Sequence, residues 1–174
     1  ITTPIAWPST NIMASSWNEE LCEDYGLAFG KDIKAYDVNC ILGPSINIQR
    51  NPLGGRNFEY YSEDPYLTGK LGAAVTRGIQ SVGVATAVKH FAVNSTEYSR
   101  LASNSVISAR AMREIYLKAF EMVIKEADPW SIMTSYNFVN GTKAAELEPM
   151  MNDIARGEWG YDGVFMTDWG NDSN

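Results

Sequence analysis

Helical patterns and short apolar runs alternate along the chain, and this alternation restricts the fold more than any other feature. Apolar residues recur at helical spacing over 17–36, 65–81, 109–127 and 147–159, and short apolar runs follow at 38–42, 84–88, 131–134 and 163–166. Runs of this length are typical of strands that are buried on both faces. Strands that alternate with helices predict an α/β fold with a parallel sheet and right-handed crossovers.

Two architectures fit this order, an eight-stranded barrel and a doubly wound open sheet. No Gly-rich phosphate-binding loop follows any apolar run, which counts against a nucleotide-binding open sheet. A complete barrel needs about 250 residues, whereas this chain has 174. We therefore expect residues 1–174 to form one domain, an incomplete (β/α)8 TIM-type barrel with parallel strands.

Helix starts can be predicted from the residues that precede each periodic segment. Residues 1–16 contain two prolines and are expected to be irregular. Ser16 is expected to cap the first helix, and Ser108 the helix over 109–127.

Four small residues carry further expectations about packing. Gly26 and Gly30 lower the propensity of the first helix, and we expect them to let that helix approach the sheet closely. Cys22 falls in a helical pattern and Cys40 in a strand pattern, so both are expected to be buried free thiols.

Composition disfavours several functional classes. Fourteen basic and twenty-one acidic residues give a net charge of −7, which disfavours binding to nucleic acid or to an anionic membrane surface. No apolar run approaches the length of a membrane span, so we expect a soluble protein, either cytoplasmic or secreted. The chain opens at Ile1 without a charged and then apolar leader, so no targeting segment is expected within it.

Polar side chains gather where the predicted strands end. They are Arg56 and Glu59 after the first strand, Lys89, His90, Glu97 and Arg100 after the second, Tyr136 and Asn137 after the third, and Asp168 and Trp169 after the fourth. Each alone has an ordinary explanation, such as a surface ion pair, a core histidine or a helix cap. The carboxyl ends of barrel strands, however, form the active-site face. Together these residues predict a polar pocket there.

The residue types in this pocket suit a sugar. A metal site is disfavoured, and no cofactor is expected, because His90 is the only histidine and no carboxylate cluster accompanies it. The cationic and hydroxyl donors can hold sugar hydroxyls, and Trp169 offers a flat face to a ring. Asp168 beneath that ring could attack an anomeric carbon, with a second carboxyl group about 5–5.5 Å away as acid/base. A Schiff-base reaction at Lys89 is an alternative.

Several ordered blocks resemble glycoside hydrolase family 3. They read GP at 43–44, NIQRNP at 47–52, GRNFEY at 55–60, SEDP at 62–65, KHFAVN at 89–94, REIYL at 113–117, SYN at 135–137, GEWGYDG at 157–163 and TDW at 167–169. The resemblance covers nearly the whole chain. It implies a β-glucosidase-like enzyme, of which this chain is part of the N-terminal barrel domain.

The resemblance also implies roles for individual residues. Asp168 matches the family's nucleophile in a retaining, covalent mechanism that releases β-D-glucose from nonreducing ends of β-glucosides. The residues that match the family's sugar-binding positions are Arg56, Lys89, His90, Arg100 and Tyr136, and Trp169 lines the same subsite. The sequence 92–94 favours the glucosidase branch over the N-acetylglucosaminidase branch.

Part of the family's site has no match in this chain. An α/β sandwich domain commonly follows the barrel and supplies the acid/base glutamate, and another sugar-binding aspartate usually lies upstream. We therefore expect the missing C-terminal domain to be a partner of this segment and the 174 residues alone to have little activity. Ser95-Thr96 also replaces the Asn-Gln of similar β-glucosidases.

Three alternatives remain at this stage. A β-xylosidase or arabinosidase of the same family would share the strand-end scaffold. A non-catalytic sugar-binding relative would keep the donors but not the reaction. A barrel aldolase that uses Lys89 is the most distant alternative.

Overall fold

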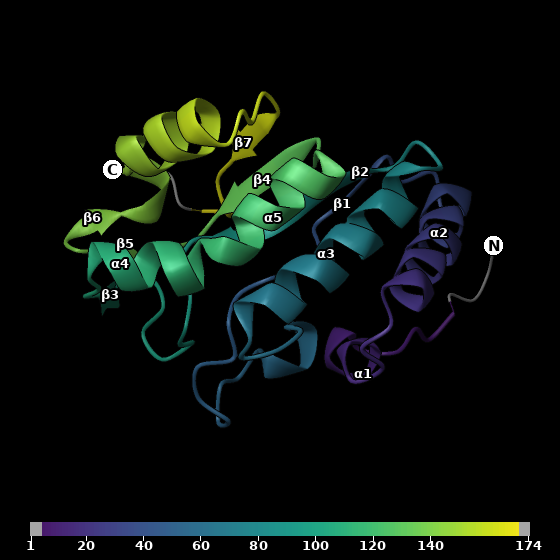
Figure 1. Ribbon diagram of the computed structural model, residues 1–174, viewed down its shortest axis with the longest axis horizontal. Helices are drawn as coiled ribbons and strands as arrows, with labels where there is room; N and C mark the ends of the chain where they lie inside the picture. The colour runs from purple at the N-terminus through teal and green to yellow at the C-terminus, as the bar shows by residue number, and fades with distance from the viewer. Residues whose placement is uncertain (1–4, 171–174) are drawn as a thin grey trace.

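The computed structural model describes residues 5–170, and its centre is a four-stranded parallel sheet (Figure 1). The strands are β1 (Cys40–Ile41), β2 (Ala85–Phe91), β4 (Ser131–Thr134) and β7 (Val164–Met166). Their order in the sheet is β1-β2-β4-β7, and every neighbouring pair is parallel. Because strand order follows chain order, the arrangement is that of successive strands in a barrel. The predicted α/β fold, an incomplete barrel, is confirmed.

Helices cover one face of this sheet, with α2, α3 and α5 side by side (Figure 1). The longer helices are α2 (Glu19–Ala35), α3 (Pro65–Gln80), α5 (Lys118–Ala127) and η4 (Pro149–Glu158), and the shorter ones are α1 (Thr10–Ala14), η1 (Asn57–Glu59), α4 (Ala109–Ala111), η2 (Met112–Tyr116) and η3 (Ala144–Glu146). The predicted single helix over 109–127 is thus divided. Its middle section η2 is a wide π-type turn, in which the N–H of Leu117 donates to the carbonyl of Met112 at 2.8 Å.

A small second sheet lies at the carboxyl-terminal side of the main sheet. It consists of β3 (Asn104–Ser105), β5 (Phe138–Val139) and β6 (Thr142–Lys143), in the order β3-β5-β6. The turn at Asn140-Gly141 joins the antiparallel pair β5 and β6. This sheet connects the loop after β2 with the loop after β4.

The two faces of the main sheet differ in what they contact. Val88, Ile132 and Phe165 are register partners and belong to the hydrophobic core beneath the helices. The next residues, Lys89 and Met133, are also register partners. Because side chains alternate along a strand, this second set faces the concave side, away from the helices. The chain therefore places Lys89 on the face that is the interior of a barrel.

The glycines of α2 allow close contact with another helix, not with the sheet as predicted. A Cβ atom on Gly26 would lie 2.4 Å from the carbonyl oxygen of Val75, and one on Gly30 would lie 3.1 Å from the Cα atom of Ile79. Both partners belong to α3. Since real Cβ atoms essentially never approach another atom to 2.4 Å and rarely to 3.1 Å, the glycines allow the close separation of α2 and α3.

Several expectations about the N-terminal part were wrong. Residues 10–14 form α1 instead of irregular chain, while residues 1–4 lie outside the described residues. The cap of α2 is Asn18, whose Oδ1 accepts from the N–H of Leu21 at 3.0 Å. Ser16 instead donates to the carbonyl of Met13 at 2.7 Å, because the turn after α1 engages its hydroxyl. The predicted cap of the later helix is confirmed, since Ser108 Oγ accepts from Ala111 at 3.2 Å.

The two cysteines differ in burial. Cys22 is a buried free thiol, as predicted. Cys40 is exposed, which contradicts the prediction. The reason is its position at the start of β1, which is the edge strand of the sheet.

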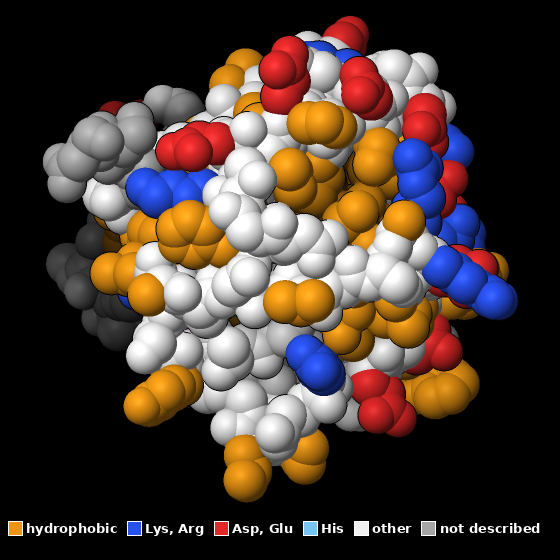
Figure 2. Space-filling model, turned by 90° about the vertical axis from the view of Figure 1, so that its left-hand side faces the viewer, with side chains coloured by type: hydrophobic (Ala, Val, Ile, Leu, Met, Phe, Trp, Pro, Cys, Tyr) orange, Lys and Arg blue, Asp and Glu red, His pale blue; other side chains and the backbone are white. Residues whose placement is uncertain are grey.

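The surface is mixed in character. On the face turned toward the viewer in Figure 2, acidic and basic side chains are interspersed, and apolar side chains appear in separate groups between them. Among residues 5–170, no helix combines the length and the hydropathy that a bilayer crossing requires.

Candidate active site

The predicted site residues all lie at the carboxyl ends of the main strands or in the loops that follow. Lys89 and His90 lie near the end of β2, and Tyr136 lies two residues beyond β4. Asp168 lies two residues beyond β7, and Arg56 lies in the loop between β1 and α3. Because the four strands are parallel, these positions share one edge of the sheet.

Asp168 and His90 lie close together at this edge. Asp168 Oδ2 is 3.9 Å from His90 Nε2, and Asp168 Oδ1 accepts a hydrogen bond from the backbone N–H of Trp169 at 2.8 Å. The His90 side chain is 2% exposed and that of Asp168 is 16% exposed. A carboxylate is thus held at a partly open position against a buried imidazole.

Asn47 fixes the orientation of His90. Its Nδ2 donates to the carbonyl of His90 at 2.9 Å, and its Oδ1 accepts from the N–H of His90 at 2.7 Å. The same Oδ1 lies 3.1 Å from His90 Nδ1. Since an amide oxygen only accepts, Nδ1 carries the proton and Nε2 is left as an acceptor.

The environment of His90 keeps the imidazole neutral. Burial, followed by the positive charges of Arg56, Lys89 and Arg100, lowers the pKa of His90 to about 2. At neutral pH its Nε2 can therefore accept a hydrogen bond from a hydroxyl group.

A carboxylate, Glu59, lies between two of the cationic residues. Arg56 Nε donates to Glu59 Oε1, while Glu59 Oε2 accepts from Ser45 Oγ at 2.7 Å and lies 4.0 Å from Lys89 Nζ. Burial lowers the pKa of Lys89; Glu59 opposes this shift, Arg56 adds to it, and Asp168 again opposes it. These residues therefore form one electrostatic unit.

Arg100 and Tyr136 form the other side of the group. The guanidinium of Arg100 lies 4.9 Å from the centroid of the Tyr136 ring, and its NH1 donates to Glu97 Oε2 at 3.2 Å. The Tyr136 hydroxyl donates to the carbonyl of Trp169. Burial raises the pKa of Tyr136, and so does the nearby Asp168 carboxylate. Tyr136 thus lies close to the candidate nucleophile.

Trp169 joins the site through its backbone. Its N–H contacts Asp168 and its carbonyl contacts Tyr136, but the residue is 69% exposed. The structure therefore brings six of the seven predicted side chains into one group, whereas the indole ring of Trp169 stays largely in solvent.

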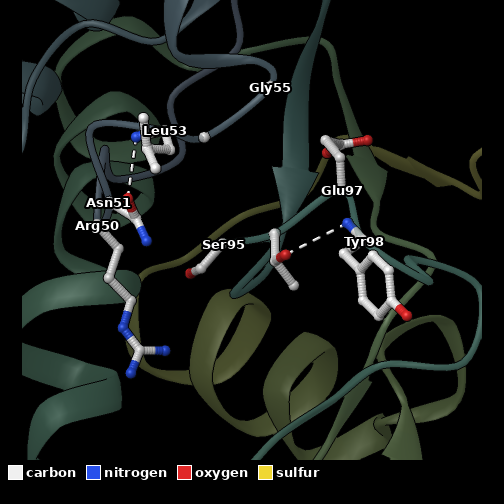
Figure 3. A pocket seen from close by; sticks show the side chains of 9 residues that line it. Arg50, Asn51, Leu53, Gly55, Ser95, Glu97 and Tyr98 are labelled. Atoms are coloured by element: carbon white, nitrogen blue, oxygen red, sulfur yellow. Dashed lines mark hydrogen bonds between the residues drawn. The ribbon is translucent and has the colours of Figure 1, made fainter.

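An open cleft of about 600 Å³ lies beside this group (Figure 3). The loop at 50–55 forms one wall and the loop at 95–98 forms the other. In Figure 3, Arg50, Asn51 and Leu53 lie on one side, and Ser95, Glu97 and Tyr98 lie on the other. Glu97 belongs both to this cleft and to the Arg100 ion pair. Asp168 does not line the cleft, so the cleft extends the site laterally.

Within residues 5–170, no group of three histidine, cysteine or acidic side chains could hold a metal ion.

Sequence reasoning placed Glu59 and Glu97 in the strand-end pocket without a separate role for either, and it gave no site role to Asn47. The structure contains an ion pair between Arg56 and Glu59. Asn47 carried no sequence signal, because its role arises only where the loop after β1 packs against β2.

Comparisons with known sequences are consistent in their result. The 166 aligned residues are 49% identical to an exo-α-(1→6)-L-arabinopyranosidase of Bifidobacterium longum and cover 95% of this chain but 22% of that protein. A β-glucosidase A of Butyrivibrio fibrisolvens is 48% identical over 164 residues, covering 94% of this chain and 20% of that protein. The chain thus spans about a fifth of the length of these curated relatives.

Solved structures of β-glucosidases also match this chain. β-Glucosidase 3B of Thermotoga neapolitana in complex with glucose matches with a TM-score of 0.93 and 45% identity, over 94% of this chain and 23% of that one. A β-glucosidase of Kluyveromyces marxianus in complex with glucose matches with a TM-score of 0.96 and 44% identity, over 98% and 21%. The model of the glycosyl hydrolase family 3 N-terminal domain matches residues 3–173. This chain therefore belongs to glycosyl hydrolase family 3 and is part of the N-terminal domain of that family.

Proposed function

We propose that this chain forms the nucleophile-bearing and sugar-binding part of a retaining β-glucosidase. The observation that carries the proposal is the position of Asp168, 3.9 Å from His90 and at the same edge as Lys89 and Arg56. Relatives of known structure that are named β-glucosidases and contain glucose support the choice of sugar.

In the proposed reaction, a carboxylate oxygen of Asp168 attacks the anomeric carbon of a nonreducing-end glucose. The bond from this carbon to the aglycone oxygen breaks, and a general acid protonates that oxygen as it leaves. Water then attacks the anomeric carbon of the glycosyl-enzyme, loses a proton to the same general acid/base, and frees the Asp168 carboxylate. Two inversions release β-D-glucose with retained configuration.

The remaining side chains bind the sugar. Lys89, Arg56 and Arg100 donate to hydroxyl oxygens, and His90 Nε2 accepts from a hydroxyl group because its proton is on Nδ1. Tyr136 holds the backbone of Trp169 beside the nucleophile, and the exposed Trp169 ring can cover the sugar from outside. Fixed donors of this kind lower the barrier by orienting the anomeric carbon.

The general acid is proposed to lie outside residues 1–174. Among the described carboxylates of the site, Glu59 accepts from Arg56 and Ser45, and Glu97 accepts from Arg100 and Asn94. Both carboxylates accept hydrogen bonds from protein donors and are therefore poorly placed to donate a proton to the aglycone oxygen. We propose that a C-terminal α/β sandwich domain supplies the acid, so the present segment alone lacks a contribution of roughly 10²–10⁴-fold to the rate.

The experiment is replacement of Asp168 by Gly in the full-length protein, followed by hydrolysis of an aryl β-glucoside. We expect turnover to be lost and azide to restore it with release of α-glucosyl azide, since azide fills the space of the carboxylate. Turnover near that of the unmodified protein would exclude Asp168 as the nucleophile.

A second candidate is an arabinosidase, favoured by the 49% identity to the arabinopyranosidase. The two share a strand-end scaffold, so specificity constants on aryl β-D-glucoside, aryl β-D-xyloside and aryl α-L-arabinopyranoside separate them. A non-catalytic relative would bind glucose in calorimetry and hydrolyse none of the three.

A further inference from the structure

We propose that Glu59 is a positioning residue, whose carboxylate holds Arg56 and Lys89 in the arrangement that binds the sugar without contacting the sugar itself. The inference rests on the proposed function, because it concerns the same site. Its basis is the convergence of three side chains from separate segments on a single carboxylate.

Both oxygens of Glu59 are directed at protein donors. Oε1 accepts from Arg56 Nε; Oε2 accepts from Ser45 Oγ at 2.7 Å and lies 4.0 Å from Lys89 Nζ. Glu59 ends η1, whereas Ser45 lies just after β1 and Lys89 lies in β2. The carboxylate therefore ties the loop that carries Arg56 to the two strands beside it.

Backbone pairing reinforces this arrangement. Ser45 forms an isolated parallel bridge with Lys89, and the N–H of Ile46 donates to the carbonyl of Lys89 at 2.7 Å. The main chain thus aligns Ser45 with Lys89. Only the Glu59 side chain brings Arg56 to the same place, because Arg56 has no backbone link to β2 among the described hydrogen bonds.

The charges require a negative group at this point. Arg56 and Lys89 are both cationic and less than a fifth of each side chain is exposed, so their mutual repulsion is weakly screened. Burial alone would raise the pKa of Glu59, but the hydrogen bonds from Arg56 and Ser45, together with the charges of Arg56 and Lys89, lower it below its ordinary value. Glu59 is therefore ionised at neutral pH and offsets the two cations.

The burial of Glu59 separates it from the ordinary ion pairs of this chain. The Glu59 side chain is 22% exposed, whereas those of Arg110 and Glu114 are 84% and 61% exposed. Exposed pairs contribute little to stability and geometry. The Arg110–Glu114 pair consequently offers a matched control on the same chain.

The first test is Glu59→Gln in the full-length protein, which keeps the size of the side chain and removes its charge. We expect KM for an aryl β-glucoside to rise about 10-fold or more, with a smaller change in kcat, since a charge-assisted contact is lost for two sugar-binding groups. Glu114→Gln should leave both constants unchanged.

The pH profile gives a readout that a merely structural role would not move. Lys89 faces Glu59, Arg56 and Asp168, and its pKa falls further when Glu59 loses its charge. The alkaline limb of kcat/KM should therefore move to lower pH in Glu59→Gln and stay in place in Glu114→Gln. An unchanged KM together with an unchanged alkaline limb would overturn the positioning role.

Ser45→Ala is the second variant and remains informative if Glu59→Gln does not fold. It removes one hydrogen bond to Glu59 and keeps every charge, so we expect KM to rise roughly 3-fold, with the alkaline limb in place. An unchanged KM in Ser45→Ala would count against the proposal. Absence of glycosidase turnover in the unmodified protein would instead defeat the proposed function, and azide rescue of Asp168→Gly alongside a normal Glu59→Gln would defeat the positioning role alone.

Discussion

His90 Nε2 lies 3.9 Å from Asp168 Oδ2, although His90 lies in β2, Asp168 follows β7, and β4 lies between those strands in the sheet. This contact brings a neutral acceptor and a carboxylate to the same point. The neighbouring cations, Lys89, Arg56 and Arg100, act on His90 as charges at short range. This relationship is the geometric basis of the proposed role of the edge in binding and attack on a sugar.

The first prediction concerns the tautomer of His90. Asn47→Asp places a carboxylate beside Nδ1, which favours the charged imidazolium and raises the pKa of His90. Nε2 then becomes a donor as pH falls, and kcat/KM for an aryl β-glucoside should show a new acidic limb. The pH–rate profile of the full-length protein checks this. Asn152→Asp, on an exposed helix position, is the control, and identical acidic limbs in both variants would refute the role of Asn47.

The second prediction links His90 to stability. Its pKa is about 2 in the folded protein and about 6.5 when unfolded. Below pH 6.5 the unfolded chain therefore binds a proton that His90 in the folded protein does not bind. The free energy of unfolding is consequently highest above pH 6.5 and falls as the pH is lowered toward 2. The slope from this group is at most about 1.4 kcal/mol per pH unit. Thermal unfolding of the full-length protein between pH 7 and 5 measures it, and His90→Gln should unfold with a shallower dependence; an equal slope would contradict the prediction.

The third prediction tests the packing of α2 on α3. Gly26→Ala forces a Cβ to within 2.4 Å of the carbonyl oxygen of Val75, so the helices must separate. We expect a loss of about 1–3 kcal/mol in unfolding free energy. Gly157→Ala, where the nearest atom would be 3.3 Å away, is expected to change stability by less than about 1 kcal/mol. Equal effects at both positions would show that α2 and α3 are not in close contact.

The fourth prediction separates the two functions of Tyr136. Tyr136→Phe removes the hydroxyl that holds the carbonyl of Trp169 but keeps the ring beneath Arg100. We expect kcat/KM to fall about 10-fold because the backbone next to Asp168 is released. Tyr136→Ala should cost more, since the cation–π contact is also lost. Tyr66→Phe, at an exposed position, is the control. An unchanged kcat/KM in Tyr136→Phe would show that the Tyr136 hydroxyl does not contribute to the reaction.

The sequence predicted the parallel sheet because apolar runs and helical periods are local properties, and residues 131–134 form a strand as expected. It also located Asp168, Lys89 and Tyr136, because parallel topology alone brings strand ends to one edge. The other features of the fold and of the site depend on contacts between segments that are distant in the sequence. The role of Asn47 depends on how one loop meets β2, and the glycines of α2 contact α3 because the two helices lie side by side on the sheet.

Local competition between similar residues explains other errors. Ser16 and Asn18 both suit a helix cap, and the turn after α1 engages the hydroxyl of Ser16 and leaves Asn18 for α2. Cys40 fits a strand pattern, but the pattern does not say whether that strand lies at an edge. The strand that contains Cys40 was therefore predicted correctly, whereas the burial of Cys40 was not.

The most direct test of the central claim is covalent labelling of the full-length protein. A 2-deoxy-2-fluoro-β-D-glucoside with a good leaving group forms a glycosyl-enzyme that hydrolyses slowly, because fluorine destabilises the oxocarbenium-like transition state. Proteolysis and mass spectrometry then locate the modified residue. We expect one label, on the peptide that contains Asp168, and no label in Asp168→Gly. A label on a different carboxylate, with Asp168 unmodified, would contradict it.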